Sequence, residues 1–217
     1  MAWFENLHSA NLSQASGICL CAYLLGCFTA GYYLVRLRLG EDIRELGSGG
    51  TGARNVGRAL GKSYFLLTLL FDFGKGCFAV WGARHFTTDD RLVALAMLAV
   101  VAGHIWPAQL RFRGGKGMST ALGALLVYDP RLAMAFVVLF LCTFALARRI
   151  VLPGLFALAC LPVASIWLVD DPTRAVHEAV CISILAGQVL VAHRKNLFEE
   201  ISHFAGRRGI HPKPDQP

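Results

Sequence analysis

Charged residues are scarce in this chain. Asp, Glu, Lys and Arg make up only 16% of its 217 residues, whereas hydrophobic residues make up 55% and the mean hydropathy is +0.52. This composition excludes a disordered chain and an ordinary soluble domain. The seven cysteines form no CxxC pair and show no zinc-ligand spacing. We therefore expect them to pack as small hydrophobic residues among helices, with no metal site.

The charge that is present is mainly positive. There are 21 Lys and Arg residues against 14 Asp and Glu, a formal charge of +7. A hydrophobic and basic chain is typical of a polytopic membrane protein with cationic loops. Apolar stretches long enough to cross a bilayer lie at 17–35, 63–83, 91–110, 131–147, 150–168 and 174–192. A shorter apolar run, Met118–Tyr128, would rise only about 16 Å, so it is either a short buried helix or a re-entrant segment.

The distribution of loop charges favours counting the short run as a crossing. With seven crossings, 16 of the 21 basic residues lie in segments 36–62, 108–117, 148–149 and 193–217, on one side of the membrane. The positive-inside rule then puts the N-terminus outside and the C-terminus in the cytoplasm. We therefore predict an all-α polytopic membrane protein, a compact bundle of about seven transmembrane helices with one of them short. Its expected parts are an external segment over 1–16, one membrane-embedded domain over 17–197 and a cytoplasmic tail over 198–217.

Two glycine-rich clusters fall on the predicted cytoplasmic side. The first, Gly47–Lys62, holds six glycines together with cations such as Arg58, a pattern that favours an anion held by backbone amides. The second, Arg111–Thr120, has Lys116 among glycines before the short apolar helix and is a plausible phosphate cradle. For either cluster alone, a flexible positive-inside loop is the alternative. A literal GxGxxG at 47–52 follows no buried strand, so we discount dinucleotide binding.

Polar side chains also occur within the predicted helices. Asp72 and Lys75 lie three residues apart on one helix face, and their cost in a bilayer predicts that they face inward and pair. This pair is either part of a polar site or an interhelical structural contact. His104 lies near the cytoplasmic end of its helix, and it is either a residue of the membrane interface or part of the site. His193 and Asn196 end the last helix on that side. His193 could act as an acid or base and Asn196 as a neutral hydrogen-bond donor, or both could simply cap the helix.

Taken together, these motifs resemble the bacterial acyl-phosphate:glycerol-3-phosphate acyltransferases, the PlsY family. The resemblance covers residues 17 to about 197, and the motifs stand in the order of the family. They are Gly47–Lys62, Asp72–Gly76, Gly103–Pro107, Gly114–Thr120 and His193–Asn196. The resemblance implies a multi-pass enzyme of the bacterial inner membrane with its active site facing the cytoplasm. It implies transfer of a fatty acyl group from acyl phosphate to the 1-hydroxyl of sn-glycerol 3-phosphate, which gives lysophosphatidic acid and phosphate.

The resemblance also implies roles for individual residues. The catalytic residues would be Ser48, Arg58, Lys116, His193 and Asn196. The residues binding substrate phosphate would be Gly47, Gly49, Gly52, Asn55, Gly114, Gly115, Gly117 and Thr120, and the supporting polar residues would be Asp72, Lys75 and His104. The mechanism would be substrate-assisted, without a covalent acyl-enzyme or a cofactor. We expect a monomer in the lipid bilayer, with no nucleic-acid partner and a functional link to an enzyme that produces acyl phosphate.

Four positions, Gly50, Arg54, Gly74 and Lys195, depart from the family pattern, and two alternatives stay open. The family commonly has Asn at Gly50 and Thr at Arg54, so the chain resembles a divergent member. A membrane transporter of a phosphorylated anion is the main alternative, and a binding protein without turnover is another. The segment His85–Asp90 matches an HxxxxD acyltransferase signature, but it falls on the predicted outer loop. We interpret it as a chance match.

Overall fold

The computed structural model describes residues 12–207, and the side chains of residues 12–198. Over that range the chain is helical and contains no strand. Its α-helices are α2 (Leu12–Cys27), α3 (Ala30–Leu39), α4 (Ala53–Leu60), α5 (Lys62–Phe86), α6 (Asp90–Ile105), α7 (Met118–Tyr128), α8 (Pro130–Ala147), α9 (Val151–Leu168) and α10 (Pro172–Arg207). Two short 3-10 turns, η1 (Ile43–Glu45) and η2 (Ala108–Leu110), lie in the connections.

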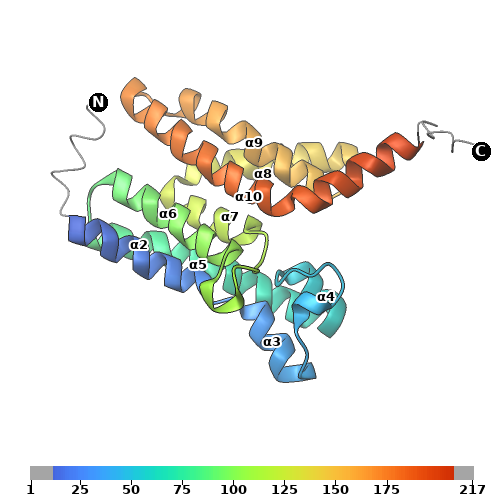
Figure 1. The fold of residues 1–217 in the computed structure, drawn as a ribbon. Coiled ribbons are helices and arrows are strands. Elements are labelled where there is room, and N and C mark those ends of the chain that lie inside the picture. Colours follow the sequence, from blue (N-terminus) through green and yellow to red (C-terminus); the bar gives the residue numbers. More distant parts are fainter. Residues whose placement is uncertain (1–11, 208–217) are drawn as a thin grey trace, which may run out of the picture.

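The helices pack as two layers that run along a common direction (Figure 1). One layer holds α8, α9 and α10, and the other holds α2, α5, α6 and α7. Contacts of α10 with α6 and of α7 with α8 join the layers around a buried apolar core. Within the described residues, six helical segments are long and apolar enough to span a membrane, with α2 and α3 counted as one, and α7 is a shorter apolar helix. The expected all-helical membrane bundle is confirmed.

Glycines let two helix pairs approach closely. A Cβ added at Gly103 on α6 would overlap the carbonyl oxygen of Tyr23 on α2. A Cβ added at Gly123 on α7 would overlap the carbonyl oxygen of Phe73 on α5. Small residues at such crossings are characteristic of helix packing in membranes, where close backbone contact replaces a hydrophobic driving force.

The position of α7 explains why it is short. It runs parallel to α5, since Ser119 Oγ donates to Leu69 O at 3.1 Å near its start and Arg84 Nη2 donates to Tyr128 O at 2.8 Å at its end. Leu69 lies seven residues into α5, so the loop before α7 enters about 10 Å into the bundle. From there an 11-residue helix reaches the opposite end. The short run is therefore a crossing and does not turn back.

The first predicted helix, 17–35, is broken at residues 28–29. The break frees backbone carbonyl groups, and distant side chains bind them. Lys75 Nζ donates to Gly26 O at 3.0 Å and to Phe28 O at 2.8 Å, while Gln109 Nε2 donates to the carbonyl oxygen between them. Because these carbonyls are satisfied inside the bundle, the chain can change direction there, and α3 diverges from α2 (Figure 1).

Other boundaries also differ from the prediction. The helix α4 lies inside the segment expected to be a loop, where Val56 packs against Val35 and Ile43. The helix α2 begins at Leu12, inside the expected external segment 1–16. The last helix was expected over 174–192, but α10 runs to Arg207 and so takes in part of the predicted tail. Residues 1–11 and 208–217 lie outside the described range.

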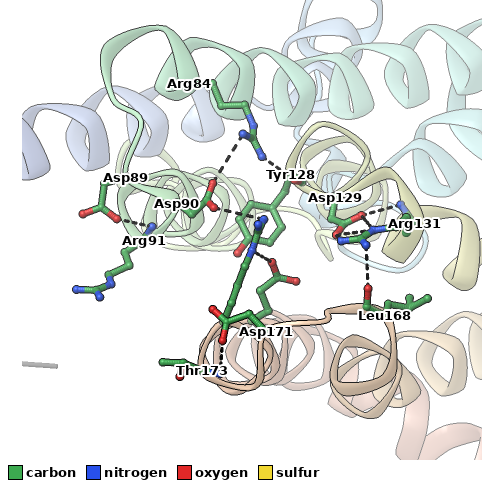
Figure 2. A network of polar contacts seen from close by, with 12 residues as sticks. Arg84, Asp89, Asp90, Arg91, Tyr128, Asp129, Arg131, Leu168, Asp171 and Thr173 are labelled. Atoms are coloured by element: carbon green, nitrogen blue, oxygen red, sulfur yellow. Dashed lines mark hydrogen bonds and ion pairs between the residues drawn. The ribbon is translucent and has the colours of Figure 1, made fainter. Parts of the chain in front are cut away.

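Ion pairs fasten the end of the bundle that lies away from the glycine loops (Figure 2). Asp90 at the start of α6 lies 3.8 Å from Arg84 of α5 and 3.3 Å from Arg174 of α10. Arg174 also pairs with the buried carboxylate of Glu178 at 3.1 Å. These contacts link helices of both layers at the same level.

The HxxxxD match lies at this fastened end. Its acidic residue is Asp90, which is engaged by the two arginines. Its histidine, His85, packs against the Trp81 ring with centroids 4.6 Å apart. The two side chains therefore have separate structural partners, as expected for a chance match.

Candidate active site

The first glycine loop is organised by one buried side chain, Asn55. Its Nδ2 lies within hydrogen-bond distance of three carbonyl oxygens, those of Ile43 at 3.2 Å, Leu46 at 2.9 Å and Gly50 at 2.9 Å. Its Oδ1 accepts from the Ser48 amide at 3.1 Å. These bonds fold the loop around the amide group and leave Ser48 exposed at its tip. In the structure Asn55 thus shapes the loop, and the phosphate contact that the resemblance implied stays a prediction.

The backbone of this loop requires glycine at two positions. Gly47 has φ +52° and Gly49 has φ +69°, both in the left-handed region that side chains with a Cβ rarely adopt. A Cβ at Gly47 would also overlap the Asn55 side chain. The loop therefore has a fixed, strongly curved shape.

The second glycine loop lies on the end of α6. The Gly114 amide donates to Ile105 O at 3.1 Å, and the Gly115 amide donates to His104 O at 3.0 Å. A Cβ at Gly114 would overlap His104 O, and a Cβ at Gly115 would overlap the His104 ring. Gly117, with φ +81°, precedes α7 and faces Ile105. The sequence predicted a phosphate cradle here, and the structure adds a packing reason for each glycine.

Backbone and side-chain bonds bring the two loops together. Thr51 N donates to Gly114 O at 3.5 Å, and Arg44 Nη1 donates to Leu110 O at 2.7 Å. Arg44 also pairs with Asp42 at 2.5 Å, and its hydrogen bonds hold the pKa of the Asp42 carboxyl below its usual range. Sequence analysis did not single out Arg44 or Asp42. Their opposite charges, two residues apart just before the glycines, were a local signal of an ion pair.

Lys116 connects these loops to the last helix. Its Nζ donates to Asn196 Oδ1 at 2.5 Å. A Cβ at Gly50 would lie 4.0 Å from Lys116 Cε, so the first loop passes beside the lysine stem. Segments more than 60 residues apart in the chain therefore meet at one half-buried lysine.

His193 lies one helical turn before Asn196 on α10 and is buried. Its Nδ1 lies 2.8 Å from Val189 O. A carbonyl oxygen can only accept a hydrogen bond, so Nδ1 carries the proton and Nε2 of the neutral ring is left as an acceptor. The charges of Lys116 and Arg54 both act on this ring. The ring thus offers an acceptor in a cationic environment.

Two arginines extend the positive charge of the site. Arg54 and Arg58 are four residues apart on α4, so they share one helix face, and both are exposed. Neither forms an ion pair with another residue of the described chain. They can therefore contact an anion without first breaking a bond.

Two further sequence candidates occupy structural positions. Thr120 is fully buried in the first turn of α7, and a Cβ at Gly76 of α5 would overlap its carbonyl oxygen. Its backbone carbonyl thus lies in the contact between α5 and α7. Gly52 is the residue before α4, in extended conformation at φ −76°.

The supporting polar residues form one buried group. Lys75 Nζ lies 3.2 Å from Asp72 Oδ1, and His104 Nδ1 lies 3.4 Å from the same oxygen. All three side chains are 5% exposed or less. The predicted pairing is confirmed, and the bonds of Lys75 to the broken first helix give the pair a structural role. Among the described residues, no group of three His, Cys, Asp or Glu side chains is arranged to hold a metal ion.

The fold and the site define a polytopic membrane protein with a cationic, glycine-rich centre at one end of its helical bundle. A family model for glycerol-3-phosphate acyltransferases matches residues 16–203. The chain belongs to the glycerol-3-phosphate acyltransferase family, PlsY.

Individual relatives agree with this assignment. A glycerol-3-phosphate acyltransferase 1 of Desulfitobacterium hafniense (strain Y51) is 46% identical over 187 residues, which cover 86% of this chain and 91% of the relative. A protein of the same name from Bacillus cereus (strain ATCC 14579) is 40% identical, over 78% of this chain and 89% of the relative. The crystal structure of PlsY, an integral membrane glycerol 3-phosphate acyltransferase, in its glycerol 3-phosphate form superposes with a TM-score of 0.76. It is 32% identical, over 87% of this chain and 92% of the other.

Proposed function

We propose that this chain transfers a fatty acyl group from acyl phosphate to the 1-hydroxyl of glycerol 3-phosphate. The products are lysophosphatidic acid and inorganic phosphate. The observation that carries the proposal is the meeting of both glycine loops with α10 at the Lys116–Asn196 contact. Both substrates carry phosphate, and Lys116, Arg54 and Arg58 supply positive charge on this side of the bundle.

The chemistry requires positioning and charge stabilisation more than a strong base. The acceptor hydroxyl oxygen attacks the acyl carbonyl carbon, the bond from that carbon to the phosphate oxygen breaks, and the hydroxyl proton passes to the departing phosphate. Lys116 and Arg58 stabilise the phosphate charge, and Asn196 orients Lys116. His193 Nε2 is available to accept a hydrogen bond from the acceptor hydroxyl.

Ser48 fits a phosphate ligand better than a nucleophile. A serine nucleophile needs an adjacent base to activate its hydroxyl. Within the described residues, no histidine or carboxylate hydrogen-bonds Ser48 Oγ, which lies at an exposed loop tip. Direct transfer without a covalent acyl-enzyme is therefore the mechanism we propose.

The membrane placement belongs to the same proposal. The cationic segments favour a bacterial inner membrane protein with its active site and C-terminus in the cytoplasm and its N-terminus outside. We propose that it acts as a monomer and uses acyl phosphate from a separate enzyme. Reporter fusions at both termini would test the orientation, and a periplasmic C-terminus would contradict it.

The decisive experiment is a donor panel with the purified protein. Acyl phosphate, acyl-CoA and acyl carrier protein are each supplied with glycerol 3-phosphate, and lysophosphatidic acid and phosphate are measured. We expect product with acyl phosphate alone. The folded variants Lys116→Ala and Arg58→Ala should lose most of the rate. Arg194→Ala is the matched control, because that exposed arginine donates back to Val191 O of its own helix at 3.3 Å.

The transporter alternative loses its main support in the structure. It was motivated by the intramembrane pair Asp72 and Lys75, by proline-containing helices and by cationic loops. The two charged side chains, however, contact each other, and Lys75 binds backbone carbonyls at the break of the first helix. Uptake of a phosphorylated anion into sealed vesicles without acyl transfer would restore that alternative.

A further inference from the structure

We propose that His104 is a positioning residue for Lys116, and that Asp72 and Lys75 hold His104 in place. The inference rests on the proposed function, since it concerns the lysine placed at the substrate phosphate. It assigns these buried groups a mechanical task in the site and no direct contact with substrate.

The backbone just before Lys116 is held by His104. The residue before Lys116, Gly115, donates its amide proton to His104 O at 3.0 Å. The imidazole of His104 packs so closely on Gly115 that a Cβ there would overlap Nε2. The backbone from which the lysine extends is therefore fixed both by a hydrogen bond and by contact with the imidazole ring.

The His104 ring is itself supported from behind. His104 is 3% exposed, and its Nδ1 faces Asp72 Oδ1 at 3.4 Å. That oxygen is also 3.2 Å from Lys75 Nζ. Lys75 is anchored in turn by Gly26 O at 3.0 Å and Phe28 O at 2.8 Å, at the break between α2 and α3. A continuous buried series of contacts thus runs from the broken helix to the lysine loop.

The loop needs such a support because it is rich in glycine. Gly114, Gly115 and Gly117 lie next to Lys116, and glycine leaves the backbone more conformational freedom than any other residue. An error of about 1 Å in the position of a catalytic group can cost about 100-fold in rate. A ring held by a buried ion pair removes this freedom without occupying the substrate space.

The kinetic test uses His104→Asn in the full-length protein. Asn keeps a polar group near the position of Nδ1, facing Asp72, but it lacks the ring that supports Gly115. We expect kcat to fall about 10- to 100-fold, with less than a threefold change in the KM for either substrate. In the Lys116→Ala background the same substitution should change kcat less than threefold, because the group it positions is already gone. Independent, multiplicative losses would overturn the proposal, as would wild-type kcat in His104→Asn.

Adding a methyl group at Gly115, with and without the His104 ring, distinguishes a loss of packing from general destabilisation. Gly115→Ala adds a methyl group against the ring and should lower kcat at least tenfold, while adding it to His104→Ala should cause no further loss. Gly82→Ala is the matched control, because nothing lies within 4 Å of a Cβ at that helical glycine, and it should keep wild-type activity. Equal losses from Gly115→Ala in both backgrounds would contradict the proposed contact.

Hydrogen exchange gives a readout that does not depend on turnover. In His104→Asn the amides of residues 114–117 should exchange at least tenfold faster than in the wild-type protein, whereas amides within α9 should not change. If these amides exchange faster in His104→Asn but the wild-type protein proves inactive, the positioning role is supported and the proposed function is rejected. If exchange in His104→Asn is unchanged and the wild-type protein is active, the positioning role alone is rejected.

Discussion

The contact between Lys116 and Asn196 makes a quantitative prediction. Lys116 Nζ donates to Asn196 Oδ1 at 2.5 Å, and a hydrogen bond to a charged group contributes about 1.5–3 kcal/mol. If Asn196 holds the lysine in the geometry that the transition state requires, Asn196→Ala loses that contribution. At about 1.4 kcal/mol per factor of ten, kcat/KM should fall about 10- to 150-fold.

A second substitution at the same position tests the sign of the charge. Asn196→Asp keeps an acceptor for Lys116 but adds a negative charge. A phosphate held on the other side of the ammonium would lie about 6 Å from that carboxylate, and at an effective dielectric constant of about 20 the repulsion is about 3 kcal/mol per unit charge. We expect a loss of about 100-fold, carried mainly by KM.

The assay measures lysophosphatidic acid formation by the purified protein over a range of both substrate concentrations. Thermal unfolding of each variant shows whether the fold is intact, and Arg194→Ala serves as the control for a lost cation nearby. Asn196→Ala within threefold of wild-type kcat/KM would show that the contact does not contribute to catalysis. Asn196→Asp with unchanged KM values would refute the charge argument.

Three other positions give further predictions. Burial raises the pKa of Asp129, but hydrogen bonds from Arg131 outweigh it and hold that pKa below its usual range. The stability contributed by Asp129 is therefore present above about pH 4 and lost as pH falls further, and the difference in melting temperature between wild type and Asp129→Asn should disappear there. Asp129→Ala should melt about 2–4 °C below Asp129→Asn at pH 7, because Asn still caps α8; equal melting would refute the cap. Arg54→Thr should raise a substrate KM about two- to fivefold at low salt, and unchanged initial rates would argue against a phosphate contact. Gly117→Ala should lower the melting temperature by about 2–8 °C, since φ is +81° there, and an unchanged melting curve would contradict this.

Much of the fold followed from the sequence. Apolar length alone predicted the membrane segments, because a bilayer requires a long hydrophobic run whatever the neighbouring helices are. The inward pairing of Asp72 and Lys75 followed from the cost of charge in lipid and their spacing on one helix face. The two glycine clusters were expected on the same side, and the structure places them in contact through Thr51 and Gly114.

The internal structure of the first cluster could not be predicted. The helix α4 has only eight residues, too few to be stable alone, and Val56 must pack on Val35 and Ile43 to support it. Nothing in the sequence indicated the structural task of Asn55, which the family resemblance placed among the phosphate-binding residues. Its bonds to the backbone of residues 43–50 show that it shapes the loop.

The sequence by itself determined which segments enter the membrane and which end carries the positive charge, because hydropathy and loop charge are local properties. Tertiary structure alone decided that the first crossing breaks at residues 28–29. No local residue there stops a helix, and the carbonyls it frees are bound by Lys75 and Gln109 from distant segments. Tertiary structure also decided that Lys116 meets Asn196 across 80 positions of sequence. The composition showed that the chain is hydrophobic with few charges, and its folding places several of those charges where two glycine loops and α10 converge.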